Sequence, residues 1–331
     1  MLVVATVACA AYWAKALAVV QPGRGTFYAA QSTTFAAWFL IGGAALLIAG
    51  LATLTRHRLV GALAIASGIC WFGPAWDGWF AGHPLVRSFG ALATAWLFPL
   101  LVHLVLTQIG GRWPRPRAAF VAVTYLACGL GATAILLVRD PDQDPYCWSN
   151  CTANSVLVSS RPALARRLTD DVRLITLLAS VVLVGVCLMD AWVRRWQVVP
   201  GGVLFGLTTA VYVVVRRIRP LEWRTNPADG LLFELRCLSV VLIAAGLATT
   251  LLSARRQRKR VAGVVRALDP SAPAGTVAAV LAHAVGDPGL EIAYPLHGAD
   301  RFVDATGQPI PTPNRDGKRI STVLTLSLIH I

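Results

Sequence analysis

The chain has 331 residues, of which 56% are hydrophobic and only 14% are charged. Soluble domains carry about 25% charged residues, so this composition excludes an ordinary soluble protein. The formal net charge of +14 would suit a nucleic-acid ligand. However, Arg gathers at the ends of apolar runs, where it snorkels and sets membrane topology, and we favour that explanation.

Apolar runs of about 18 or more residues recur before residue 254, and runs of that length can cross the hydrocarbon layer as helices. Polar loops with Pro, Gly or Arg separate these runs. The sequence therefore predicts a mainly α, polytopic membrane bundle over residues 1–253. We expect about eight transmembrane helices, over residues 1–21, 35–53, 59–80, 86–109, 118–138, 174–193, 203–215 and 231–252.

The positive-inside rule favours a cytoplasmic C-terminus, because an even number of spans places both termini on one side. The short loops on that side carry several Arg residues, although the loop after the seventh span is also rich in Arg. The abundance of Arg, Ala, Val, Leu and Gly indicates a GC-rich bacterial genome. We therefore expect a multi-pass protein of the bacterial inner membrane. The last span ends in a basic collar made of Arg255, Arg256, Arg258, Lys259 and Arg260.

After the collar the chain becomes polar. Residues 254–274 are expected to form a basic juxtamembrane linker helix, and residues 275–325 to begin a cytoplasmic α/β domain that is cut short. Within that domain we expect a helix at 275–286 and strands at 290–296, 300–304 and from 319 onward. Residues 326–331, LSLIHI, resemble a translated sequencing adapter and are expected to be an artefact. The alternative is an ordinary strand.

Two cysteines lie in the longest loop of the membrane region, in the sequence YCWSNC. Cys147 and Cys151 are four residues apart on the side assigned to the outside, where an oxidising compartment favours a disulfide. A reduced pair without function is the alternative, and the loop offers no His for a metal site. The other five cysteines lie in apolar runs and are expected to pack as small hydrophobic residues, namely Cys9, Cys70, Cys128, Cys187 and Cys237.

Ionisable residues inside the expected spans are candidates for function, because such groups are costly in hydrocarbon. His103 lies deepest in its span and is a candidate relay or ligand residue, with a satisfied packing histidine as the alternative. Asp190 is a second candidate and is spaced to pair with Arg194 across one helical turn. Glu234 is a third, although a position near a helix end makes snorkelling cheap.

Motifs for catalysis are absent from the chain. It has no phosphate-binding loop with Lys and Ser/Thr, no HExxH and no GxSxG. His283, in VLAHAVG, has no neighbouring acidic or basic cluster that would activate it as a phosphate acceptor. The sequence therefore predicts no catalytic, cofactor-binding or metal-binding residue.

Three segments resemble a family of polytopic sensor histidine kinases from high-GC bacteria: FPLLVHLVLTQIGGRWPRP at 98–116, DPYCWSNCTANSVLV at 144–158 and VLAHAVGDPGLEIAYPLHGADRFVDATGQPI at 280–310. In that family a membrane sensor region leads into a GAF-like domain, a helix with the phospho-accepting His and an ATPase domain. The resemblance implies that residues 275–325 begin a GAF-like domain. It also implies a parent protein that uses ATP and Mg to phosphorylate its own His, works as a homodimer and passes the phosphate to a response regulator.

The resemblance transfers no catalytic residue, because the kinase motifs of the family do not occur in these 331 residues. This chain would be the sensor and transmitter part of the kinase, with the lipid bilayer as its immediate partner and no nucleic acid. A non-catalytic membrane receptor or anchor is the alternative function. A transporter is a weaker one, since His103, Asp190 and Glu234 are too scattered to line a polar path.

Overall fold

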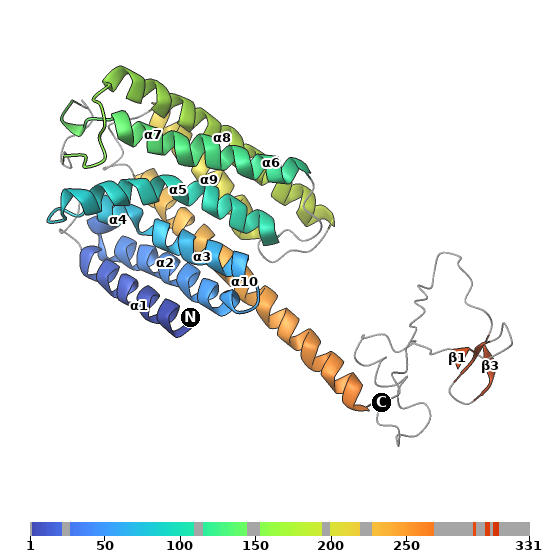
Figure 1. Ribbon diagram of the computed structural model, residues 1–331. Coiled ribbons are helices and arrows are strands. Elements are labelled where there is room, and N and C mark those ends of the chain that lie inside the picture. Colours follow the sequence, from blue (N-terminus) through green and yellow to red (C-terminus); the bar gives the residue numbers. More distant parts are fainter. Residues whose placement is uncertain are drawn as a thin grey trace. The chain divides into compact units, whose positions relative to one another are not determined.

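The computed structural model describes residues 2–21, 27–108, 115–143, 153–193, 199–218, 227–267, 294–295, 302–304 and 307–310. The chain divides into two compact units, residues 1–251 and 252–331. The described part of the first unit is helical, with its elements in the order α1 (Leu2–Val19), η1 (Tyr28–Gln31), α2 (Thr33–Leu54), α3 (Arg58–Trp71), α4 (Gly73–Asp77), α5 (Pro84–Gln108), α6 (Arg115–Thr124), η2 (Tyr125–Leu130), α7 (Gly131–Val138), η3 (Pro141–Gln143), α8 (Pro162–Val193), α9 (Val199–Ile218) and α10 (Pro227–Ala267) (Figure 1).

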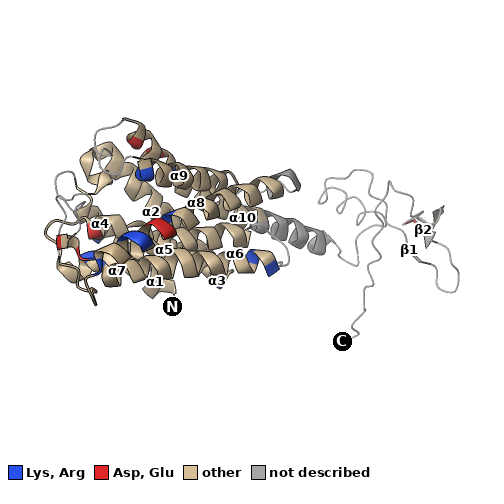
Figure 2. Cartoon of the chain, turned by 90° about the horizontal axis from the view of Figure 1, so that it is seen from above, with Lys and Arg blue, Asp and Glu red and all other residues tan. Residues whose placement is uncertain are grey.

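Eight helical segments of the described chain are long and apolar enough to cross a membrane, as the sequence predicts. Their outward surface is apolar as well: Val4, Ile48 and Val181 are 72%, 67% and 59% exposed. Charged residues are sparse along the described helices (Figure 2). Side chains of this kind are stable at the surface only against lipid, so the chain is a multi-pass membrane protein.

Helix α5 lies at the centre of the bundle (Figure 1). It packs against α3 and α4 on one side and against α6, η2 and α7 on the other, while α8 pairs with α7 and α9. The α2–α3 pair is close enough for backbone contact. A Cβ atom added at Gly61 would lie 2.5 Å from the Cα of Leu54. Small residues at such contacts are how membrane helices approach each other without a hydrophobic driving force.

Two of the spans are interrupted. The third is divided at Phe72 into α3 and α4, because Pro74 at the start of α4 lacks the N–H that a continuous helix needs. The fifth consists of α6, a π-helical turn at η2 (Tyr125–Leu130) and α7. Neither interruption is evident from hydropathy.

The sequence-based bounds of the sixth and seventh spans are wrong. Helix α8 begins at Pro162 rather than at Leu174. Its first turns are polar, so hydropathy assigns them to the loop, yet an ion pair between Asp170 and Arg173 at i,i+3 supports the helix there. Helix α9 covers residues 199–218 rather than 203–215. The helix continues beyond the apolar run, through Pro and Gly residues at its start and through Arg216 and Arg217 at its end.

Helix α10 continues through the basic collar to Ala267 without a break. The described part of the second unit also holds three two-residue strands, β1 (Tyr294–Pro295), β2 (Phe302–Val303) and β3 (Pro309–Ile310), which pair antiparallel in the order β1-β2-β3. The first two lie within expected strands, whereas β3 lies in a segment expected to separate strands. The helix expected at 275–286 and the strand expected from 319 lie outside the described residues. A GAF-like fold is not shown.

Candidate functional site in the membrane bundle

A histidine and a tyrosine form a polar pair inside the bundle. Nδ1 of His103, on α5, lies 3.2 Å from the hydroxyl oxygen of Tyr125, the first residue of η2. The two rings meet edge to face, with centroids 5.7 Å apart and an interplanar angle of 88°. His103 is half-buried. The sequence singled out His103, and the structure gives it a hydrogen-bond partner that the sequence did not identify.

Both partners lie beside irregular helix geometry. Pro99 lies inside α5, one turn before His103, and removes one backbone hydrogen bond from that helix. Tyr125 starts the π-helical turn, a feature that occurs frequently at functional sites. Each helix therefore has fewer regular backbone hydrogen bonds where the two side chains meet, and less resistance to a local change of shape.

Further polar contacts extend from this pair to α7 and α8. The ring centroids of Trp96 and Tyr125 lie 5.9 Å apart, and Trp96 Nε1 donates to Thr133 Oγ1 at 3.2 Å. In the same π-helical turn, Cys128 Sγ lies 3.4 Å from Thr176 Oγ1 on α8. We call the set of His103, Tyr125, Trp96 and Thr133 the polar centre. Through it and the neighbouring Cys128, side-chain hydrogen bonds connect three consecutive spans.

The chemistry open to the polar centre is proton sharing and hydrogen bonding. A neutral His103 can donate to the tyrosine oxygen or accept from the hydroxyl, according to its tautomer. Within the described ranges no group of three His, Cys, Asp or Glu side chains is arranged to hold a metal ion. The contact with the Tyr125 hydroxyl suits a ligand or relay role for His103.

Glu234 and Asp190 do not join the polar centre through any described contact. Glu234, on α10, is half-buried and close to Tyr28 at the start of η1. Burial of Tyr28, together with the negative charges of Asp229 and Glu234, raises the pKa of its hydroxyl. Asp190 lies in the last turn of α8, but its side chain and its expected partner Arg194 lie outside the described residues.

A polar clamp at the end of the bundle where α5 begins escaped the sequence analysis. Nδ2 of Asn154 donates to the carbonyl oxygens of Leu136 and Arg139 at 2.6 and 3.0 Å. Its Oδ1 lies 3.4 Å from Ser88 Oγ on α5, and that hydroxyl accepts from the Ser155 N–H at 3.0 Å. These bonds attach the loop before α8 to α5 and to the end of α7. A single Asn in a polar loop gives no sequence signal for such contacts.

Of the two remaining predicted features, one lies outside the described residues and the other is described only in its backbone. Cys147 and Cys151 lie outside the described residues. The backbone of the basic collar, residues 254–260, is helical, while its side chains lie outside the described part. The other five cysteines pack in the bundle as expected: none forms a disulfide, four of them are buried and Cys70 is half-buried.

Comparison of the chain with protein-family models, with curated proteins and with solved structures found no match. The functional interpretation therefore depends on the geometry of the bundle and on the sequence segments described above.

Proposed function

We propose that this chain is the membrane sensor and signal-transmitting part of a two-component sensor histidine kinase of the bacterial inner membrane. The observation that carries the proposal is the length and continuity of α10. This helix has 41 residues from Pro227 to Ala267. Its apolar part, Ala228–Ser253, is long enough to cross the membrane.

A continuous helix is a physical means of transmission, because its backbone hydrogen bonds resist bending and twisting. At 1.5 Å per residue α10 is about 62 Å long, and the part after Ser253 extends about 21 Å. That part begins with the basic collar, which suits the anionic inner leaflet. Displacement or rotation of α10 in the bundle would therefore reach a domain that follows residue 267, which we place in the cytoplasm.

The polar centre is the proposed point at which a stimulus changes the bundle. It joins α5, which lies at the centre of the helix packing, to the spans formed by α6–α7 and α8. Pro99 and the π-helical turn lower the cost of a shift there. Altered protonation or ligand contact at His103 would change the packing of α5 against its neighbours.

In this proposal the kinase chemistry belongs to a part of the parent protein that lies beyond these residues. That part would bind ATP and Mg, phosphorylate its own His within a homodimer and transfer the phosphate to a response regulator. A non-catalytic receptor or anchor is the rival function. The two differ in what the gene encodes after Thr325.

The first test is to sequence the source locus beyond the codon for Thr325. The proposal expects a continuous reading frame that completes a GAF-like domain and continues into a His-bearing helix and an ATP-binding domain. A stop codon directly after Ile331 would refute it in favour of a receptor or anchor.

The second test inserts alanines after Ser253 in the full-length protein and measures autophosphorylation in membrane vesicles. A helix turns about 100° per residue, so two alanines rotate the following segment by about 200°, whereas seven return it to within about 20° of its original phase. We expect the insertion of two alanines to disrupt the regulation of autophosphorylation and the insertion of seven alanines to preserve it. Equal effects of both insertions would contradict transmission through a rigid helix.

The collar gives a third test in the same vesicles. Replacing Arg255, Arg256, Arg258 and Arg260 with Gln removes four positive charges, each worth about 1 kcal/mol of attraction near an anionic surface. We expect this variant to uncouple the stimulus from autophosphorylation while basal activity persists. Unchanged signalling would show that the collar does not anchor the helix.

A further inference from the structure

Two arginine side chains converge on one tyrosine between α9 and α10. The Cζ atom of Arg216 lies 5.3 Å from the centroid of the Tyr212 ring, and the Cζ atom of Arg236 lies 5.1 Å from it. The Arg216 side chain also hydrogen-bonds that of Tyr212. Tyr212 itself is 37% exposed. Two positive charges thus share one ring that is open to the surroundings of the bundle.

Among the described residues, Arg236 has none of the acidic partners that a charged group inside a membrane span requires. It lies nine residues into α10, about 14 Å along the helix from Pro227. Its Nε is fully covered and has no hydrogen-bond partner. For its guanidinium, the described residues provide the face of Tyr212 but no carboxylate within ion-pair distance. A charge in this position is costly unless an anion accompanies it.

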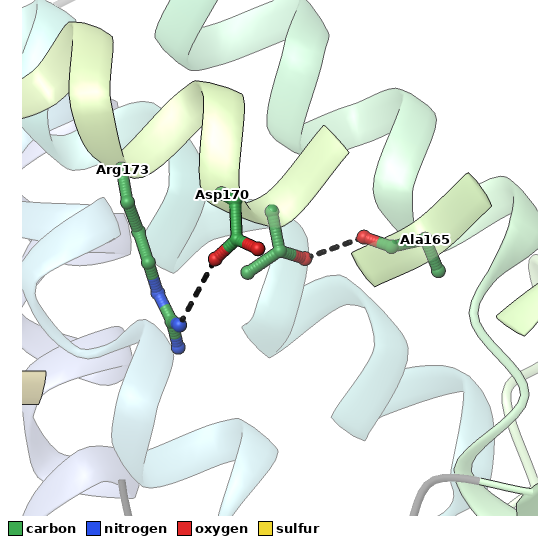
Figure 3. Close-up of polar contacts among 4 residues, drawn as sticks. Ala165, Asp170 and Arg173 are labelled. Atoms are coloured by element: carbon green, nitrogen blue, oxygen red, sulfur yellow. Dashed lines mark hydrogen bonds and ion pairs between the residues drawn. The ribbon is translucent and has the colours of Figure 1, made fainter. Parts of the chain in front are cut away.

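A third arginine nearby shows the arrangement that Arg236 lacks. The charge of Arg173, on α8, also acts on the Tyr212 hydroxyl. Arg173 Nη1 lies 3.9 Å from Asp170 Oδ1, one turn earlier on the same helix (Figure 3). Arg173 thus has an acidic partner one turn away, whereas the described residues give Arg236 none.

We propose that Tyr212, Arg216 and Arg236 bind a phosphate group. Guanidinium groups present several N–H donors in a planar fork that matches phosphate oxygens, and the tyrosine hydroxyl adds another donor. Arg216 lies two residues before the end of α9, so its long side chain can reach the headgroup region at the end of the bundle where α9 ends and α10 begins. The phosphate therefore belongs to an anionic lipid or is a soluble phosphate. This inference is independent of the kinase proposal, since it concerns binding alone.

The test uses the full 331-residue chain, delipidated in dodecyl maltoside and phosphate-free buffer. Inorganic phosphate is titrated while tryptophan fluorescence and the thermal midpoint are recorded. In a separate arm, native mass spectrometry compares retention of phosphatidylglycerol with retention of phosphatidylcholine. We expect binding in one arm, and we expect Arg236→Gln to weaken it about tenfold or more, because hydrogen bonds to charged groups are among the strong ones.

Arg217→Gln is the matched control, because it removes the same charge from an exposed position next to Arg216 on the same helix. It should leave binding within about twofold of the wild type, since exposed charges in water interact weakly. Arg216→Gln provides a second test if Arg236→Gln fails to fold. Arg236→Lys, which keeps the charge but loses the planar fork, should bind more weakly than the wild type.

The two arms distinguish the sources of the phosphate. Saturable binding of inorganic phosphate indicates a soluble ligand, and selective retention of phosphatidylglycerol indicates a headgroup; each supports the proposal. Absence of both in the wild type overturns it. The proposal is also overturned if a folded Arg236→Gln protein binds phosphate as tightly as the wild type. The same holds if Arg217→Gln loses as much phosphate affinity as Arg236→Gln.

Discussion

The contact between α9 and α10 gives a sharp test of how the proposed signalling helix is held. Gly201 on α9 faces the backbone of α10 so closely that an added Cβ would lie 2.6 Å from the N atom of Ile243 and 2.8 Å from its Cγ1. Backbone atoms cannot rotate away as a side chain can. Replacing Gly201 with Ala therefore forces the two helices apart.

The magnitude follows from this geometry. Ordinary contact begins at 3.4 Å, so the helices must separate by about 0.8 Å, and dispersion contacts along the interface are lost. Overpacking of this kind costs about 1–3 kcal/mol. Gly185, in the middle of α8, is a matched control, because a Cβ there meets nothing within 4 Å. Both variants replace Gly with Ala, which stabilises a helix by about 1 kcal/mol in each case. The difference between their unfolding free energies therefore measures the clash alone.

The assay is SDS-induced unfolding of each variant in dodecyl maltoside micelles, followed by circular dichroism. We expect Gly201→Ala to unfold with a free energy about 1–3 kcal/mol lower than Gly185→Ala. Leucine at the same two positions should widen the gap, because its side chain cannot be accommodated by a small shift. The close α9–α10 contact would be refuted if the unfolding free energies differed by less than about 0.5 kcal/mol between the two Ala variants and also between the two Leu variants.

Three further predictions concern the polar groups. Tyr125→Phe removes the hydrogen bond to His103 and should lower the unfolding free energy by about 0.5–1.5 kcal/mol in the same SDS assay; an unchanged value would show that the pair contributes nothing to stability. Asn154→Ala leaves two backbone carbonyl groups without their donors and should cost about 1–3 kcal/mol, with faster hydrogen exchange in residues 153–161; wild-type exchange there would contradict the clamp. If Cys147 and Cys151 form a disulfide, maleimide should label them only after reduction, as read by mass spectrometry of the loop peptide, whereas labelling without reductant would show free thiols.

The number and approximate position of the spans follow from the sequence because they depend on a local property. An apolar run long enough to cross the hydrocarbon layer satisfies its own backbone hydrogen bonds as a helix, whatever its neighbours are. For the same reason His103 was identifiable as a candidate from its position alone: an ionisable residue deep in an apolar run is costly wherever the run packs.

Hydropathy failed where polar residues continue a helix or where a helix changes its geometry. The first turns of α8, from Pro162, are polar and were assigned to a loop. The break at Phe72 follows from Pro74, which a hydropathy average does not register, while the π-helical turn that begins at Tyr125 lies where its span packs against α5. Periodicity within one segment contains no information about those neighbours.

The partners of the functional candidates were decided by the tertiary structure alone. Tyr125 is 22 residues from His103, and Arg236 meets Tyr212 from a different helix. Such pairs form because helices from distant parts of the chain pack side by side, and the rotation of each helix determines which polar side chain meets which. The sequence by itself thus determined a membrane bundle and named residues that are costly within it. Only the packed structure determined which of them share a hydrogen bond, and which guanidinium lies over a tyrosine ring.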